Sequence, residues 1–325
     1  MNLSPDFPIP AEDLHTDLAF PSGAHVRRLL KAQMELGIQP IPASEFLKLD
    51  RAKLRRPSEL WPILDKAWSL HSRGRVDLAQ AKIDDYFDEP GTNKRLSDAI
   101  FDFCMRMLAP ARFSLFKDAA SFAADTNSNH GDKFSEFIGH LKGDVSKGNL
   151  ERFHETFKEY FACYSDFSQT LSYATHGLDV PGNHEASSSA FHKTKLFYGN
   201  AYENLTTNVA TLACLNNVAA GRSFNEFLTT DLKSYMTFNK AKRCNPFQEV
   251  EPLMNIGKCL ESTIRNASHH GAMRLINNGR TIQYRSGGNG AHKTMTYLDY
   301  VGACNEIMLS TCALLALELL LLHNA

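Results

Sequence analysis

The 325-residue sequence lacks the residue patterns that mark several common classes of site. Its seven cysteines are scattered without a Cys-x-x-Cys pair, which argues against a disulfide framework and against a zinc site. The glycine-rich segment 286–290 is not followed by a helix that carries Lys and Ser or Thr, so it does not form a P-loop. A Gly-x-Ser-x-Gly segment is also missing, which excludes the nucleophile elbow of many hydrolases. We therefore expect no metal, no cofactor and no disulfide.

The sequence also has little net charge and no long unbroken hydrophobic run. Its formal net charge is -1, so overall basicity gives no argument for nucleic-acid binding, and any anion site must be local. The most apolar segment, 301–322, contains Asn305, Glu306 and Glu318, so we expect a core or subunit-interface helix rather than a membrane span. The first residues lack a basic stretch followed by an apolar one, so we expect no signal peptide and a cytoplasmic protein.

Helical patterns dominate the chain. Hydrophobic residues make up 43% and charged residues 22%, as is typical of soluble globular domains. Between residues 149 and 177 the aromatic side chains recur at helical spacing, which predicts a helix with its aromatic face in a core. We expect an all-α protein with a mostly helical N-terminal domain over 1–145, of unassigned role, and a helical bundle over 146–325. Gly143 and Gly148 mark the boundary.

Local sequence signals predict further elements in the second half. A capping-box pattern that begins at Ser223 predicts a helix over 223–240. Apolar residues at helical spacing predict one helix over 249–270, ended by a glycine. The segments 281–285 and 293–298 have the composition of short strands and are separated by a glycine-rich loop, which predicts a β-hairpin.

One stretch of the sequence, from Ser262 to Leu298, contains no Asp or Glu. It holds several cationic residues and histidines, so we expect a local positive field that binds a phosphate-rich ligand. The alternative is that these cations pair with acids from elsewhere in the fold. The candidate RNA- or phosphate-binding residues of this stretch are His269, Arg274, Arg280, Arg285 and Lys293.

The stretch begins with a motif, Arg265-Asn266 followed by His270-Gly271. This segment resembles the Arg-x4-6-His motif of HEPN domains, which often has Asn after the Arg and Gly after the His. The expected surroundings are similar to that family as well: amphipathic helices before the motif, a small hairpin after it, and an apolar last helix. The resemblance covers roughly residues 150–325, and the N-terminal half has no counterpart.

The resemblance implies an endoribonuclease that needs no metal. RNA carries its own nucleophile, the 2′-hydroxyl, so the enzyme has to move protons and stabilise the charge on the phosphorus. His270 is the expected general acid or base, because an imidazole titrates near neutral pH. Arg265 is expected to contact the scissile phosphate, and Asn266 to orient the catalytic groups or a phosphate oxygen. The products would be a 2′,3′-cyclic phosphate and a 5′-hydroxyl, and family analogy suggests a role in phage defence or as a toxin.

Several alternatives stay open at the level of the residues. Positions five apart on a straight helix differ by about 140° around its axis, so Arg265 and His270 converge only where the helix ends or distorts. His269 lies nearer the face of Arg265 and is the rival catalytic histidine. Glu261 is spaced to form a merely structural ion pair with Arg265. The chain would then be a silent HEPN-like module that binds RNA, a nucleotide or a protein, or a helical scaffold.

The resemblance also implies partners. Catalytic HEPN domains commonly work as pairs whose motif helices meet across a two-fold axis. The single motif and the strongly apolar last helix fit this arrangement, so we expect RNA as substrate and a homodimer with a composite cleft. A regulatory protein partner is left open, and no membrane is expected.

Overall fold

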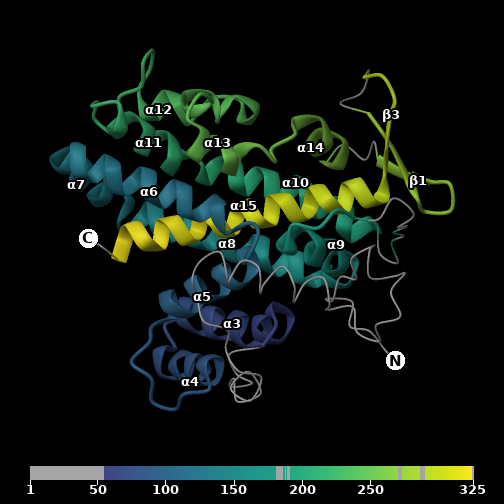
Figure 1. Cartoon of the computed structure of the whole chain (residues 1–325), viewed down its shortest axis with the longest axis horizontal. Helices are drawn as coiled ribbons and strands as arrows, with labels where there is room; N and C mark the ends of the chain where they lie inside the picture. The colour runs from purple at the N-terminus through teal and green to yellow at the C-terminus, as the bar shows by residue number, and fades with distance from the viewer. Residues whose placement is uncertain are drawn as a thin grey trace, which may run out of the picture.

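The computed structural model describes residues 55–180, 186, 188, 191–269, 273–285 and 290–323. This part of the chain is mostly helical and has one small antiparallel sheet, which precedes the last helix in the sequence and lies at the opposite end of the molecule from the C-terminus (Figure 1). The all-α class expected from the sequence is therefore confirmed.

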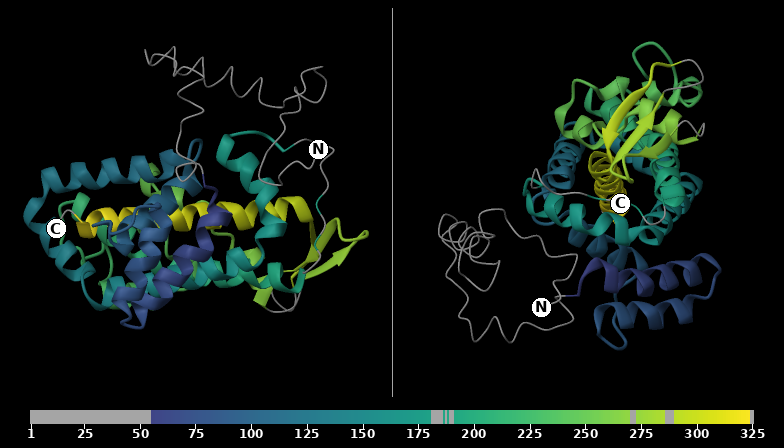
Figure 2. Two further views of the ribbon diagram at one scale, coloured as in Figure 1. Left: turned by 90° about the horizontal axis from the view of Figure 1, so that it is seen from below. Right: turned by 90° about the vertical axis from the view of Figure 1, so that its right-hand side faces the viewer.

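The helices are packed around α15 (Tyr297–His323), which runs along the middle of the molecule (Figures 1 and 2). In chain order the other described helices are α3 (Pro57–Ser72), α4 (Val76–Phe87), α5 (Leu96–Leu108), α6 (Phe113–Asn129), α7 (Gly131–Leu141), α8 (Asp144–Ala162), α9 (Tyr164–His176), α10 (Phe191–Asn208), α11 (Ala210–Ala219), α12 (Leu232–Tyr235), α13 (Glu251–Gly257) and α14 (Ser262–His269), with short 3-10 turns η3 (Lys240–Lys242) and η4 (Asn245–Phe247). In the end-on view on the right of Figure 2, several helices surround α15, while α3 and α4 lie below them and pack against α5.

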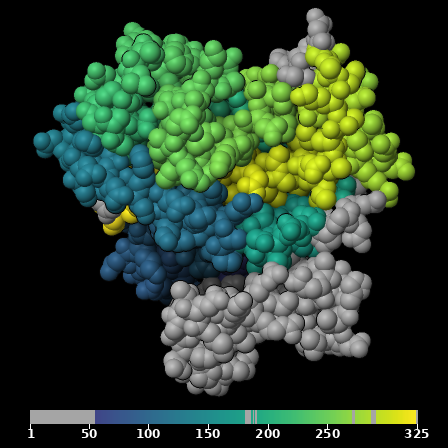
Figure 3. Space-filling model, turned by 45° about the horizontal axis from the view of Figure 1, so that its top comes forward, coloured from purple at the N-terminus to yellow at the C-terminus, as the bar shows by residue number. Residues whose placement is uncertain are grey.

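The burial of α15 explains its composition. Its side chains from Ile307 to Leu317 are apolar or small, and all of them are at most 2% exposed. By length and composition alone α15 could cross a membrane, but 72% of its most apolar window is buried inside the protein, as in the core helix of a soluble protein. The other helices cover most of it (Figure 3). The chain itself therefore covers this helix, and the apolar composition of α15 no longer argues for a dimer.

Aromatic residues of α8 and α9 form a large part of the core, as their spacing predicts. Phe153, Phe157, Tyr160 and Phe167 are all at most 1% exposed. The expected single helix is divided at Cys163 into α8 and α9. Helices on both sides of residue 145 share one hydrophobic core, and the division into two domains at that point stays a prediction.

The predicted helix over 223–240 is wrong. Most of this segment forms turns, with a bridge between Glu226 and Asp231 and a single helical turn, α12. Asp231 caps that turn by accepting a hydrogen bond from the backbone N–H of Ser234 at 2.7 Å. Arg243, 4% exposed, binds the backbone carbonyl oxygens of Met236 and Phe238, so a buried side chain a few residues further along holds the end of the segment in this shape.

The predicted helix over 249–270 is divided into α13 and α14, and Tyr198 of α10 lies at the break. The Tyr198 hydroxyl donates to the carbonyl oxygen of Cys259 at 2.7 Å and accepts from the N–H of Glu261 at 2.9 Å. These backbone groups are thereby satisfied outside a helix. The break sets α14 as a separate short helix against α10.

The predicted hairpin is confirmed as β2 (Thr281–Tyr284) and β3 (Lys293–Thr296). A further strand that the sequence analysis missed, β1 (Met273–Ile276), pairs antiparallel with β2, so the sheet has the order β1-β2-β3. Asn277 and Asn278 have positive φ angles of 51° and 55° in the turn between β1 and β2, a conformation that asparagine tolerates better than most residues.

Candidate active site

The motif helix α14 packs closely against α10. Gly199 lies at the contact: a Cβ atom there would be 2.8 Å from the Ser268 hydroxyl and would overlap the His269 ring. Ser268 is buried and donates to the backbone carbonyl of Lys195 on α10. The absence of a side chain at Gly199 therefore lets the C-terminal end of α14 rest on the backbone of α10.

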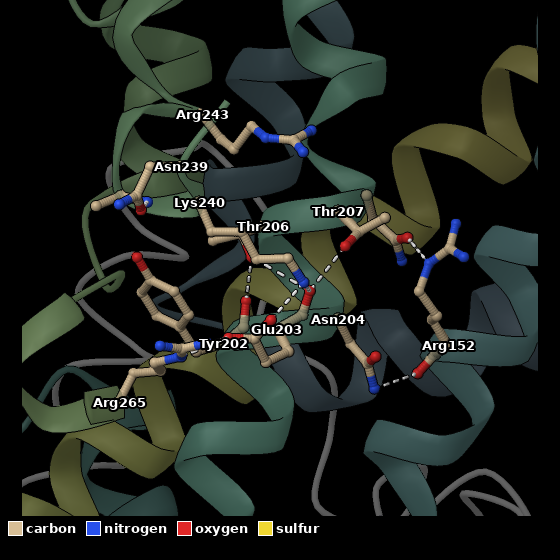
Figure 4. Close-up of polar contacts among 12 residues, drawn as sticks. Arg152, Tyr202, Glu203, Asn204, Thr206, Thr207, Asn239, Lys240, Arg243 and Arg265 are labelled. Carbon is tan, nitrogen blue, oxygen red and sulfur yellow. Dashed lines mark hydrogen bonds and ion pairs between the residues drawn. The ribbon is translucent and has the colours of Figure 1, made fainter. Parts of the chain in front are cut away.

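Arg265 is held in place by two neighbours. Its Nε and Nη2 groups form an ion pair with Glu203 of α10, and its Nη1 group donates to Asn266 Oδ1 at 2.8 Å (Figure 4). The side chains of Arg265 and Glu203 are 30% and 24% exposed. A half-buried guanidinium with fixed partners presents its remaining N–H groups in one orientation. Among the described residues its acidic partner is Glu203 rather than Glu261.

A second cation shares the Glu203 carboxylate. Lys240 of η3 has its Nζ atom 2.5 Å from Glu203 Oε2 and also donates to the Glu203 backbone carbonyl at 3.0 Å. Burial acts to raise the pKa of Glu203, but the hydrogen bonds and charges of Lys240 and Arg265 outweigh it and lower that pKa. Glu203 is therefore ionised at neutral pH, and the three side chains together carry one net positive charge.

A small cavity of about 340 Å³ opens beside these residues. Burial raises the pKa of Tyr202, one of its lining residues, to about 12, so this phenol is protonated at neutral pH. The cavity thus combines two cations with neutral hydrogen-bonding groups, a chemistry suited to an anion such as a phosphate. Its lining residues are Tyr202, Asn239, Lys240, Ala241, Ser262, Arg265 and Asn266.

The histidines of the motif end α14. His269 is its last residue, exposed to solvent, with its ring against Gly199. His270, the residue predicted as general acid or base, lies outside the described residues, as does Gly271. Helix α14 ends one turn after Arg265. A helix end at this position is what the sequence analysis requires for Arg265 and a motif histidine to converge.

The other predicted phosphate-binding residues lie on or beside the sheet and do not line the Arg265 cavity. Arg274 is paired with Gln283 in the sheet, and Lys293 is paired with Tyr284. Because alternate residues of a strand point to opposite faces, these two cations lie on different faces of the sheet. Arg280 lies in the turn at the end of the sheet away from Arg285. The structure brings Arg265 and Asn266 together and spreads these sheet cations apart.

Sequence reasoning missed two members of the site, Glu203 and Lys240. Glu203 is the lone acidic residue of α10, which is otherwise neutral or basic. A lone acid on a helix is a faint signal, and nothing in the sequence pairs it with Arg265, 62 positions further along the chain. Lys240 reaches the site because of the irregular segment before α13, which was predicted as a helix. Within the described residues, no group of three His, Cys, Asp or Glu side chains is arranged to hold a metal.

Comparison of the chain with models of protein families, with curated proteins and with solved structures finds no match. The resemblance to HEPN domains therefore rests on the motif that begins at Arg265. The geometry of Arg265, Glu203 and Lys240 is a separate observation, independent of that resemblance.

Proposed function

We propose that this protein is a metal-independent endoribonuclease of the HEPN kind, with Arg265 and His270 as its catalytic pair. The observation that supports it best is the fixed guanidinium of Arg265 at the edge of a cationic cavity, in the turn of α14 that precedes the histidine. Asn266 lines the same cavity and binds Arg265, as a residue that orients the catalytic groups would.

In this proposal the reaction uses the nucleophile that RNA itself carries. The 2′-hydroxyl attacks the adjacent phosphorus, the bond from phosphorus to the 5′-oxygen breaks, and a 2′,3′-cyclic phosphate forms. His270 moves the proton at the attacking or the leaving oxygen. Arg265 stabilises the negative charge that develops on the non-bridging oxygens, since a guanidinium forms strong charge-assisted hydrogen bonds with phosphate.

Glu203 and Lys240 have supporting roles in this proposal. Glu203 binds two nitrogen atoms of Arg265 and so fixes the plane of the guanidinium. Lys240 offsets the charge of Glu203, which leaves the site with a net positive charge for the phosphate. Without Lys240, the pair of Arg265 and Glu203 would be neutral and would attract an anion less strongly.

The wider biology of the protein is part of the same proposal. We infer a homodimer in which the Arg265 sites of both chains face a common cleft, acting in the cytoplasm in phage defence or as a toxin. Since α15 is covered within one chain, the dimer proposal rests on the motif alone. A regulatory protein partner is compatible with this role.

The decisive experiment is RNA cleavage by the purified protein in EDTA, with the ends of the products mapped. We expect the wild type to leave 2′,3′-cyclic phosphates, and Arg265→Ala and His270→Ala each to lower the rate by about 100-fold or more. Arg73→Ala is the matched control, because this exposed arginine lies outside the acid-free stretch and does not line the cavity. An equal loss in all three variants would contradict the assignment of the pair.

The second candidate is a module that binds RNA without cleaving it. The ion pair with Glu203 favours this candidate, because an arginine that is held by a carboxylate can bind a phosphate without taking part in a reaction. Gel-shift measurements with the same variants distinguish the two. Binding that is lost in Arg265→Ala, with no cleavage by the wild type, would establish this second function. Loss of folding alone would point to a helical scaffold.

A further inference from the structure

Arg152 of α8 is a half-buried arginine without an acidic partner. Its Nε donates to Asn208 Oδ1 at 2.7 Å and its Nη2 donates to Asn149 Oδ1 at 2.5 Å. Both acceptors are neutral carboxamides, and no carboxylate of the described residues lies within 4.0 Å of the guanidinium. Burial lowers the pKa of Arg152, although Glu318 and Glu151 partly oppose this effect. Its positive charge is therefore held rigidly and remains uncompensated at short range.

The polar cluster around Arg152 has more donors than acceptors. Asn208 is 1% exposed, and its Nδ2 group has no hydrogen-bond partner. Glu318 is 2% exposed and accepts from Asn149 Nδ2 at 2.8 Å and from Thr211 Oγ1 at 2.6 Å. Burial raises the pKa of Glu318 to about 7, so this carboxyl carries only part of a negative charge at neutral pH. Buried charges are normally compensated, and Asn208 lines neither cavity at Arg152, so the group that lacks an anion is the Arg152 guanidinium.

Arg152 lies where two cavities meet. The larger is a cleft of about 1150 Å³ between α3, α5 and α8, and the smaller is a cavity of about 270 Å³ between α7, α8, α11 and α12. Gly148 and Arg152 line both of them. Gly148 leaves the Arg152 guanidinium uncovered by a side chain at this point. A Cβ atom built on Gly148 would lie 3.5 Å from Arg152 Nη1.

The charged residues of α8 give the larger cleft a cationic end. Lys147, one residue before Gly148, is exposed and lines the cleft together with Arg152. The lining holds three acids. Glu159 accepts from Asn200 Nδ2 at 2.9 Å and Glu155 from Asn204 Nδ2 at 3.5 Å, while Glu151 is exposed beside Arg152, so Lys147 and Arg152 together outweigh it by one positive charge. Figure 4 shows that Arg152 lies on the other side of α10 from Arg265, so this is a site separate from the proposed active site.

We propose that the cleft between α3, α5 and α8 binds a small phosphorylated molecule, whose phosphate is held by Arg152 and Lys147. A phosphate fits the observations because its oxygen acceptors and two negative charges match a fixed guanidinium and a lysine that line the same cleft. The volume of the cleft is sufficient for a ligand of nucleotide size. The site does not depend on the proposed nuclease function.

The cleft has a built-in reporter of binding. Trp68 lines it, stacked on His154 with ring centroids 4.6 Å apart, while Trp61 is the other tryptophan of the chain and does not line it. The test is a titration of the full chain with three phosphate compounds. Binding of inorganic phosphate and ribose 5-phosphate is measured by tryptophan fluorescence, and binding of adenosine 5′-monophosphate is measured by calorimetry. We expect saturable binding that requires the phosphate. No binding of any of the three, or equal binding of ribose and adenosine, would overturn the proposal.

Variants locate the phosphate. Lys147→Glu reverses an exposed charge without disturbing the core, and we expect it to weaken binding at least about tenfold. Arg152→Met should abolish binding, with the fold checked by circular dichroism. Arg222→Met is the matched control, since Arg222 also donates to a carboxamide oxygen, of Asn217 at 3.1 Å, but does not line the cleft. Unchanged binding in Lys147→Glu and Arg152→Met would place the ligand elsewhere and refute the site.

Discussion

At the scale of single residues, the most informative side chain of the candidate site is Glu203. It binds Arg265 and Lys240 at once, so removal of its charge leaves two cations facing each other. In Glu203→Gln we expect the free energy of unfolding to fall by about 1 kcal/mol, because the ion pairs are a quarter exposed and solvent screens them. We also expect the rate of RNA cleavage to fall about tenfold, because Arg265 loses its fixed orientation. The small loss of stability would not by itself lower the rate, since the protein stays folded.

Chemical denaturation and initial cleavage rates measure the two effects separately. Glu155→Gln is the control, since Glu155 also accepts a hydrogen bond from a residue of α10 but contacts neither cation. Because the folded-state pKa of Glu203 is lowered, its contribution to stability is present above the ordinary pKa of a glutamate and is lost as the pH falls through the lowered value. A variant with full cleavage activity would show that Arg265 needs no such support.

Glu318 predicts the opposite pH dependence. Burial raises its pKa from an ordinary value of 4.5 to about 7, so the folded state favours the protonated carboxyl. Its contribution to stability is complete below about pH 4.5 and is lost as the pH rises toward 7. Glu318→Gln keeps an acceptor for Asn149 and Thr211 without a charge, so we expect it to be more stable than the wild type by about 3 kcal/mol at pH 8. Urea denaturation at pH 5 and pH 8 measures this, and an equal difference at both values would contradict it.

At the scale of elements, two glycines of the helices predict contrasting results. Gly302 lies inside α15 and a Cβ atom there would meet nothing within 4 Å. Gly302→Ala should therefore stabilise the protein by about 0.5–1 kcal/mol, because alanine favours helix. Gly199→Ala should destabilise it by about 1–3 kcal/mol and lower RNA cleavage, because the new methyl group pushes α14 away from α10. Thermal unfolding of both variants measures these effects. Equal shifts of the unfolding temperature would show that α14 can move away from α10 without a loss of stability.

Comparison of these elements with the sequence predictions shows what a local pattern determines. The aromatic spacing of α8, the apolar run of α15 and the hairpin of β2 and β3 are local signals, and the structure confirms them. The helix predicted over 223–240 is absent, and the carbonyl oxygens of Met236 and Phe238 bind Arg243, which the capping pattern at Ser223 does not include. The break between α13 and α14 is made by Tyr198 of another helix.

The residues of the candidate site also divide into those that a local pattern predicts and those that it does not. Arg265 and Asn266 could be predicted, since they belong to one contiguous motif. Glu203 and Lys240 could not, because they reach Arg265 from other elements of the fold. The same holds for Arg152, whose partners Asn149 and Asn208 are unremarkable in the sequence.

At the scale of the whole molecule, the proposed function includes a homodimer whose two Arg265 sites face a common cleft. We expect sedimentation at micromolar concentration to show a dimer, and dilution to lower the specific cleavage rate as the dimer dissociates. The covering of α15 within one chain means that the monomer should stay folded when this happens. A monomer that cleaves RNA at a rate independent of concentration would show that one copy of Arg265 and His270 is sufficient.

The position of α15 also bears on how the protein is made. During synthesis, every other described helix leaves the ribosome before α15 does, yet most of them bury their apolar faces against it. The nascent chain therefore exposes those apolar faces until residues 297–323 emerge, a stage at which a chain is prone to aggregate. If the protein is a nuclease, the same order of events keeps the Arg265 site from being completed until residues 297–323 have emerged.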